Sequence, residues 1–161
     1  MLRNLLVVVH AGSGIVGLLA GLWAMAPPRP DDGRGWVRRL YLAGIATLFV
    51  TLVALIVVDW NDLDNGGRIA FVALAGLAIF MLWRLTRADR EGRTRSSGWQ
   101  QRYVGHVYFT YVSLWIGFVI LPALNSPIPF VAAPLAVATA LVIGGILIGR
   151  YKRQLAVTDG D

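Results

Sequence analysis

Two histidines are the residues of this chain best suited to do chemistry. His10 and His106 are its only histidines, and each lies inside a long apolar stretch. A neutral imidazole can bind haem iron or another metal, and it titrates near physiological pH. An ionisable side chain inside a membrane is costly, so both are candidate functional groups. The alternative is that each imidazole is neutral and hydrogen-bonds a neighbouring helix.

Small residues follow each histidine at helical spacing. His10, Gly14, Gly17 and Gly21 recur at intervals of four, three and four residues, and so do His106, Thr110, Ser113 and Gly117. Residues at this spacing share one face of an α-helix. Similar stripes of small residues lie in the second and fifth apolar stretches: Gly44, Thr47, Thr51 and Ala54 in the second, and Ala136, Ala140, Gly144 and Gly145 in the fifth. Small side chains let helices approach closely in lipid, so we expect these faces to point inward.

Five apolar stretches make up most of the 161 residues and would carry these stripes. They run over about Asn4–Met25, Val37–Val58, Gly66–Leu85, Tyr103–Ala123 and Phe130–Gly149. Each is long enough to cross a hydrocarbon layer of about 30 Å as a helix. The sequence therefore predicts one all-α integral membrane domain, a bundle of five transmembrane helices.

Basic residues are distributed unevenly about these stretches. Thirteen of the fifteen lysines and arginines lie within 29–39, 84–102 and 150–153, on one side of the predicted membrane. Arg3 and Arg68 fall on the other side. The positive-inside rule then predicts a cell-membrane protein with its N-terminus outside and its C-terminus in the cytoplasm. The net charge of +6 is thus an orientation signal and an attraction to anionic headgroups, and it does not indicate nucleic-acid binding.

The predicted depths of the two histidines argue against one haem held by both. His10 lies about 9 Å below the outer end of its span, and His106 about 6 Å inside the inner end of its own. In a layer of about 30 Å this leaves about 15 Å between them along the membrane normal. The two axial ligands of one iron need nearly the same depth, so we expect two separate polar sites.

The outer site would contain His10 and Asp59, with Asn125 nearby. Asp59 ends the second span, where it could pair with His10 and favour proton exchange, or could simply be solvated.

The inner site gathers polar and soft side chains that suit a quinone, a lipid headgroup or a metal. Its candidate members are Met25, Tyr41, Met81, Tyr103 and His106, with Arg39 and Arg102 close by. The alternative is that they anchor the helices at the interface and fill gaps between them.

No motif in the sequence indicates an enzyme. The chain has no cysteine, which excludes disulfides and thiolate ligands, and it has no phosphate-binding glycine loop. The middle of the spans carries almost no charge, which disfavours transport by a single chain. Ala24-Met25-Ala26 has the pattern of a signal-peptide cleavage site, but Pro27 follows it and the apolar run is long. We therefore expect a retained first span.

Three segments resemble an uncharacterised family of small bacterial membrane proteins of unknown function. They are Val9–Gly17, Phe71–Arg84, and Gly105–Leu114 with its continuation to Pro129. The family has a histidine in its first span and another before a Tyr-Val-Ser-Leu type of run in a later one. The resemblance implies the topology and highlights His10 and His106, but it implies no reaction. The family often has a His-Arg pair where this chain has Val37–Tyr41.

The leading hypothesis is a non-enzymatic accessory or interaction protein of the inner membrane, with lipids, a second copy or another membrane protein as partner. The runner-up is a redox or cofactor-binding protein that holds haem or quinone through His10 or His106. A third is an oligomeric transporter of small solutes.

Overall fold

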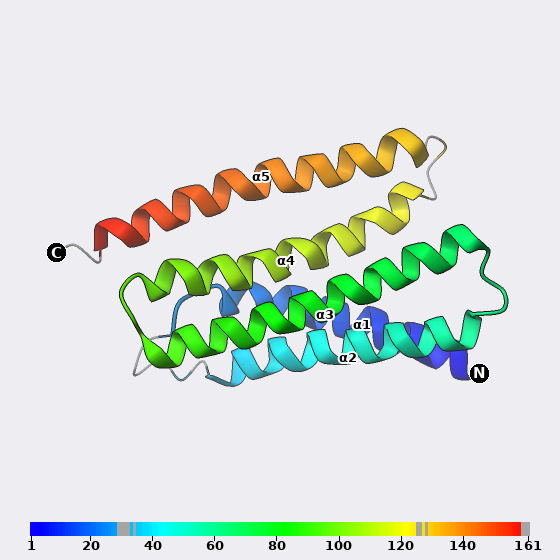
Figure 1. The fold of residues 1–161 in the computed structure, drawn as a ribbon, viewed down its shortest axis with the longest axis horizontal. Coiled ribbons are helices and arrows are strands. Elements are labelled where there is room, and N and C mark those ends of the chain that lie inside the picture. The colour runs from blue at the N-terminus through cyan, green and yellow to red at the C-terminus, as the bar shows by residue number, and fades with distance from the viewer. Residues whose placement is uncertain (29–32, 34, 125–126, 128, 159–161) are drawn as a thin grey trace.

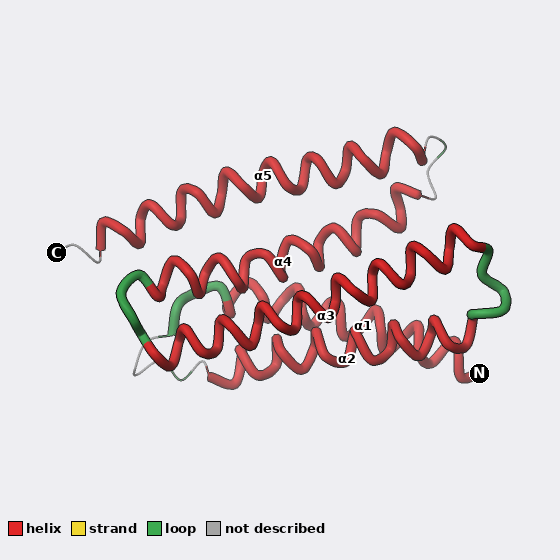
Figure 2. Tube along the Cα trace, viewed as in Figure 1, coloured by secondary structure: helices red, strands yellow, loops and turns green. Residues whose placement is uncertain are grey.

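A computed structural model describes residues 1–28, 33, 35–124, 127 and 129–158. It contains five helices joined by short connections, and no described residue is in a strand (Figures 1 and 2). The helices are α1 (Leu2–Ala24), α2 (Gly35–Asp59), α3 (Asn65–Thr94), α4 (Trp99–Leu124) and α5 (Pro129–Thr158). The predicted all-α fold is confirmed, with one helix for each apolar stretch.

Successive helices run antiparallel, and the first four form a bundle. In it α1 packs against α2 and α4, and α3 packs against the same two helices. Helix α5 lies on the outside of the bundle along α4, and α4 is its one neighbour among the described helices (Figure 1). The two termini lie at opposite ends of the bundle.

Three of the helices are long and apolar enough to cross a membrane. Among the described residues these are α1, α2 and α3. Their large side chains point outward to an unusual degree: Leu19, Val50 and Ile69 are each more than 60% exposed. Helices with large apolar side chains on their surface suit a lipid environment. In lipid an apolar side chain gains little free energy from burial in protein, because the lipid tails are equally apolar.

Two helices extend well past the predicted spans. Helix α3 ends at Thr94 rather than near Leu85, and α5 ends at Thr158 rather than near Gly149. The polar residues between the third and fourth predicted spans, from 86 to 102, are therefore mostly helical, and only residues 95–98 connect α3 to α4. Hydropathy marks the part of a helix that fits lipid, whereas charged residues continue a helix readily in water. An ion pair at 2.8 Å between Asp89 and Arg93, one turn apart, supports this polar end.

Glycines set the close approach of α1 to α4 and to α2. Three of them on α1 each face a large side chain of α4, in the pairs Gly14 with Phe118, Gly17 with Leu114 and Gly21 with Tyr111. Gly44 of α2 lies against the backbone of α1, where a Cβ would sit 3.3 Å from the carbonyl oxygen of Ser13. The inward stripe predicted for the first span is thus confirmed, while Thr47 in the stripe of the second span is exposed.

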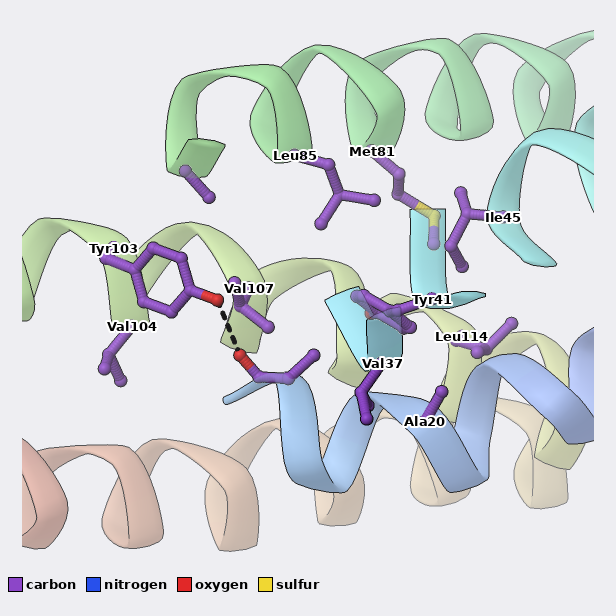
Figure 3. Packing of buried hydrophobic residues seen from close by; sticks show 12 residues of the cluster. Ala20, Val37, Tyr41, Ile45, Met81, Leu85, Tyr103, Val104, Val107 and Leu114 are labelled. Carbon is purple, nitrogen blue, oxygen red and sulfur yellow. Dashed lines mark hydrogen bonds between the residues drawn. The ribbon is translucent and has the colours of Figure 1, made fainter. Parts of the chain in front are cut away.

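The best-packed core lies toward the end of the bundle where the C-terminus lies. Tyr41 and Ile45 of α2 and Val104 and Val107 of α4 are almost fully buried there (Figure 3). Met81 and Leu85 of α3 close the same cluster, which also includes Ala20 and Ala24 of α1. Four helices therefore meet at this end, and the candidate site described next is built on this core.

Candidate functional site

A cavity of about 640 Å³ opens at this end of the bundle. The last residue of α1, the first turns of α2, the polar end of α3 and the start of α4 all line it. Its apolar floor belongs to the core cluster and is formed by Ala24, Leu85, Ala88 and Val107. A volume of this size is typical of sites for small molecules.

Arginines dominate the polar lining of the cavity. Arg38 and Arg39 come from the first turns of α2, and Arg90 and Arg93 from the end of α3. The one acidic residue of the described lining is Asp89, and its carboxylate is paired with Arg93. Arg39 and Arg90 have no acidic partner within the described lining, so positive charge exceeds negative charge among these residues. Because like charges repel in a confined space, this arrangement favours a bound anion.

The two tyrosines of the lining are held by hydrogen bonds within the protein. The Tyr103 hydroxyl donates to the carbonyl oxygen of Ala24 at 2.8 Å, a bond drawn in Figure 3. This satisfies one of the carbonyls that a helix leaves free at its C-terminus. The Tyr41 hydroxyl lies 2.8 Å from Oγ1 of Thr110. Because the Thr110 hydroxyl donates to the carbonyl of Val107, Tyr41 is the donor. Both hydroxyl protons are thus used inside the protein.

His10 forms a hydrogen bond with a threonine of the neighbouring helix α2, and not with a second ionisable group. Its Nδ1 lies 3.1 Å from Oγ1 of Thr51, across the contact between α1 and α2. The Thr51 hydroxyl also lies within bonding distance of the carbonyl oxygens of Thr47 and Leu48, at 2.8 and 3.0 Å. A hydroxyl has one proton to donate, so Nδ1 of His10 carries the hydrogen and Thr51 accepts it. This leaves Nε2 as the acceptor nitrogen.

Asp59 is paired with Arg3 and not with His10. The Arg3 Nε lies 3.1 and 3.0 Å from the two carboxylate oxygens, which joins the start of α1 to the end of α2. Of the two alternatives for Asp59, the pairing with His10 is therefore not formed, because the guanidinium at the neighbouring helix end binds the carboxylate. Asn125, the third residue suggested for this group, lies outside the described residues.

The helix register puts His10 and His106 near opposite ends of the bundle. Given the way Gly17 faces Leu114 and Gly21 faces Tyr111, His106 lies level with the end of α1. It is then about 16 residues from His10 along the axis, or about 24 Å at 1.5 Å per residue. Two imidazoles at this separation do not fit the two axial positions of one haem.

The candidates predicted for the inner site divide into three groups. Met81 and Tyr103 are buried in the core, and Met25 packs partly against it. Arg39 lines the cavity as expected, whereas Arg102 turns away to bind Glu91 at 2.9 Å and the carbonyl of Ser97 at 2.8 Å. His106 is partly buried on α4, outside the described lining. Within the described residues, no three His, Asp or Glu side chains are grouped to hold a metal.

Sequence reasoning missed Arg38, Arg90 and Arg93 as members of the site. They were visible only as orientation signals, and Arg90 and Arg93 belonged to a predicted loop. The three-residue spacing of Arg90 and Arg93 fits a helix, and this signal could have placed these two arginines on neighbouring positions of one helical face.

Arg84 is a further polar contact inside the bundle. Its guanidinium donates to the carbonyl oxygen of Gly105 at 2.9 Å and lies 4.9 Å from the centre of the Phe109 ring. This arginine therefore joins α3 to α4 at Gly105, the residue that precedes His106.

Comparison with known proteins returns no match: no protein-family model, no curated protein and no solved structure is similar to this chain. The resemblance to an uncharacterised bacterial family stays a prediction.

Proposed function

We propose that the chain is a five-span protein of a bacterial-type inner membrane that acts as a non-enzymatic accessory or interaction protein. Its N-terminus is outside, and its C-terminus and the arginine-lined cavity face the cytoplasm. An odd number of antiparallel helices agrees with this orientation, and so does the strong excess of arginine at the cavity end. The family resemblance noted in the sequence belongs to the same proposal.

The observation that carries the non-enzymatic role is the use of interior polar groups for packing. His10 joins α1 to α2 through Thr51, Tyr41 joins α2 to α4 through Thr110, and Tyr103 joins α4 to α1. Hydrogen bonds between helices are a common way to stabilise a membrane bundle. These side chains therefore have a structural explanation that requires no reaction.

Tryptophans support the proposed position of the bundle in the bilayer. Trp36 and Trp60, at the two ends of α2, are exposed and 24 residues apart, which is about 36 Å of helix. This length suits a position of both in the headgroup regions, where tryptophan is enriched. At the two faces, Arg87 stacks on Trp83 and Arg68 stacks on Trp60, at 5.1 and 5.2 Å from the ring centres.

Reporter fusions at both termini test this proposal. A reporter active only in the cytoplasm and one active only outside are fused in turn to each end of the full chain. The proposal expects the outside reporter to work at the N-terminus and the cytoplasmic reporter at the C-terminus. Two termini on one side would contradict it, because five antiparallel spans cannot return to the starting side.

A membrane redox or cofactor-binding protein is the second candidate. It is favoured by one observation: His106 follows Tyr103, which lines the cavity, by about one helical turn. The test is a visible spectrum and a quinone extraction of protein purified from haem-replete cells. A Soret band or a stoichiometric quinone that is lost in His106→Ala would favour this candidate over the accessory role.

A further inference from the structure

We propose that the arginine-lined cavity binds the phosphate group of an anionic phospholipid from the inner leaflet. The inference deepens the proposed function, and it depends on the proposed orientation only for the choice of leaflet. The shared chemistry is that of a phosphate ester, which could come from a lipid headgroup or from a soluble molecule.

The first step is the charge of the cavity. Arg39 and Arg90 line it from two helices, and the one carboxylate of the described lining, that of Asp89, is paired with Arg93. Arginine is suited to phosphate because its planar group can donate two parallel hydrogen bonds to two oxygens. Gly35, the first residue of α2, also lines the cavity, so the positive end of that helix adds to the attraction.

The second step is the depth of the cavity. Arg39 lies about one turn inward of Trp36 along α2, and Arg90 lies about two turns outward of Trp83 toward the end of α3, so the cavity lies between the levels of the two tryptophans. Both tryptophans are exposed and belong to the belt that marks the headgroup region. The guanidinium groups are therefore at the level where lipid phosphates lie. Basic pockets between membrane helices on the cytoplasmic side are a recurrent form of headgroup site.

The third step is the shape of the polar and apolar lining. The charges form the rim, and the floor is formed by core side chains such as Leu85 and Val107. Leu42 also lines the cavity and is 41% exposed on the outer face of α2. An exposed apolar side chain therefore belongs to the lining as well. This combination suits an amphiphile better than a fully water-soluble anion.

The test is a titration of the detergent-purified full chain by native mass spectrometry. The probes are short-chain phosphatidylglycerol, short-chain phosphatidylcholine and glycerol phosphate, a soluble phosphate ester without acyl chains. We expect phosphatidylglycerol to bind at least about tenfold more tightly than phosphatidylcholine, whose choline cation is repelled by the arginines. Glycerol phosphate binding as tightly as phosphatidylglycerol would assign the same phosphate site to a soluble ligand and overturn the lipid source.

Matched pairs of variants locate the binding. Arg39→Gln with Arg90→Gln removes two charges from the cavity, and we expect it to weaken phosphatidylglycerol binding about tenfold. Arg87→Gln with Arg153→Gln removes the same charge from outside the described lining, where Arg87 stacks on Trp83, and we expect binding within about twofold of the wild type. Equal binding by the two double variants would overturn the proposal.

A third variant changes binding in the opposite direction. Asp89→Asn removes the only acidic side chain of the described lining and releases Arg93. We expect tighter binding of phosphatidylglycerol, by about two- to fivefold, because the carboxylate that repels phosphate is removed and Arg93 is released. The Asp89–Arg93 pair is exposed and contributes little to stability, so the variant should keep its fold. A gain cannot come from misfolding, so unchanged or weaker binding would count against the proposal. None of these titrations depends on membrane orientation, so their failure is separable from failure of the reporter test.

Discussion

Gly21 is the residue at which the contact between α1 and α4 is tightest. A Cβ at this position would lie 2.6 Å from a ring carbon of Tyr111 and 3.0 Å from one of Tyr41. We expect Gly21→Ala to lower the free energy of unfolding by about 1–3 kcal/mol through overpacking. Gly12→Ala is the control, because nothing lies within 4 Å of its Cβ, and its melting temperature in detergent should be unchanged or slightly higher. Equal effects at the two glycines would contradict this packing.

The bond between His10 and Thr51 allows a second prediction about single residues. A double-mutant cycle with His10→Ala and Thr51→Val should give a coupling energy of about 0.6 kcal/mol, the usual size for hydrogen bonds between membrane helices. Unfolding of the four proteins in detergent measures it. A coupling indistinguishable from zero would mean that the two side chains do not bond, and would remove the structural explanation for His10.

At the level of the helices, the docking of α5 depends on one of two adjacent glycines. A Cβ on Gly144 would collide with the Tyr108 hydroxyl and lie 3.3 Å from Val112, whereas nothing lies within 4 Å of a Cβ on Gly145. We expect Gly144→Ala to lower the free energy of unfolding by about 1–3 kcal/mol, seen as a lower melting temperature in detergent, and Gly145→Ala to leave both nearly unchanged. The reverse order would mean that α5 presents another face to α4.

The sequence predicts the number and order of the helices well, because apolar length is a property of each segment alone. It also predicts the glycine face of α1, where Gly14, Gly17 and Gly21 follow one helical stripe. It fails beyond Leu85, because the polar end of α3 is helical without being apolar. Long-range pairing is equally hidden: Asp59 binds Arg3, 56 residues away, and not His10.

At the level of the whole molecule, the candidate site is created by the register of the helices. Arg39 and Arg90 reach one cavity only because α3 continues for about two turns beyond the apolar part and the start of α2 lies beside it. Neither condition can be deduced from hydropathy. Of the predicted inner group, Tyr41, Tyr103 and Arg39 line the cavity, whereas Arg102 of α4 binds Glu91 of α3 across the turn between these helices.

The orientation of this arginine-rich end in the membrane can be tested at one peptide bond. Glu91 is the only glutamate in the chain, so a glutamate-specific protease has a single site, between Glu91 and Gly92. Arg102→Gln removes the ion pair that holds Glu91 and should make the site easier to cut, because cleavage requires local opening of the helix.

Cleavage is measured in right-side-out and inside-out membrane vesicles, with detergent-solubilised protein as the positive control. A cytoplasmic cavity predicts that inside-out vesicles give two fragments, 1–91 and 92–161, and that right-side-out vesicles give none. Cleavage in right-side-out vesicles and protection in inside-out vesicles would place the arginines outside the cell and contradict the proposed topology.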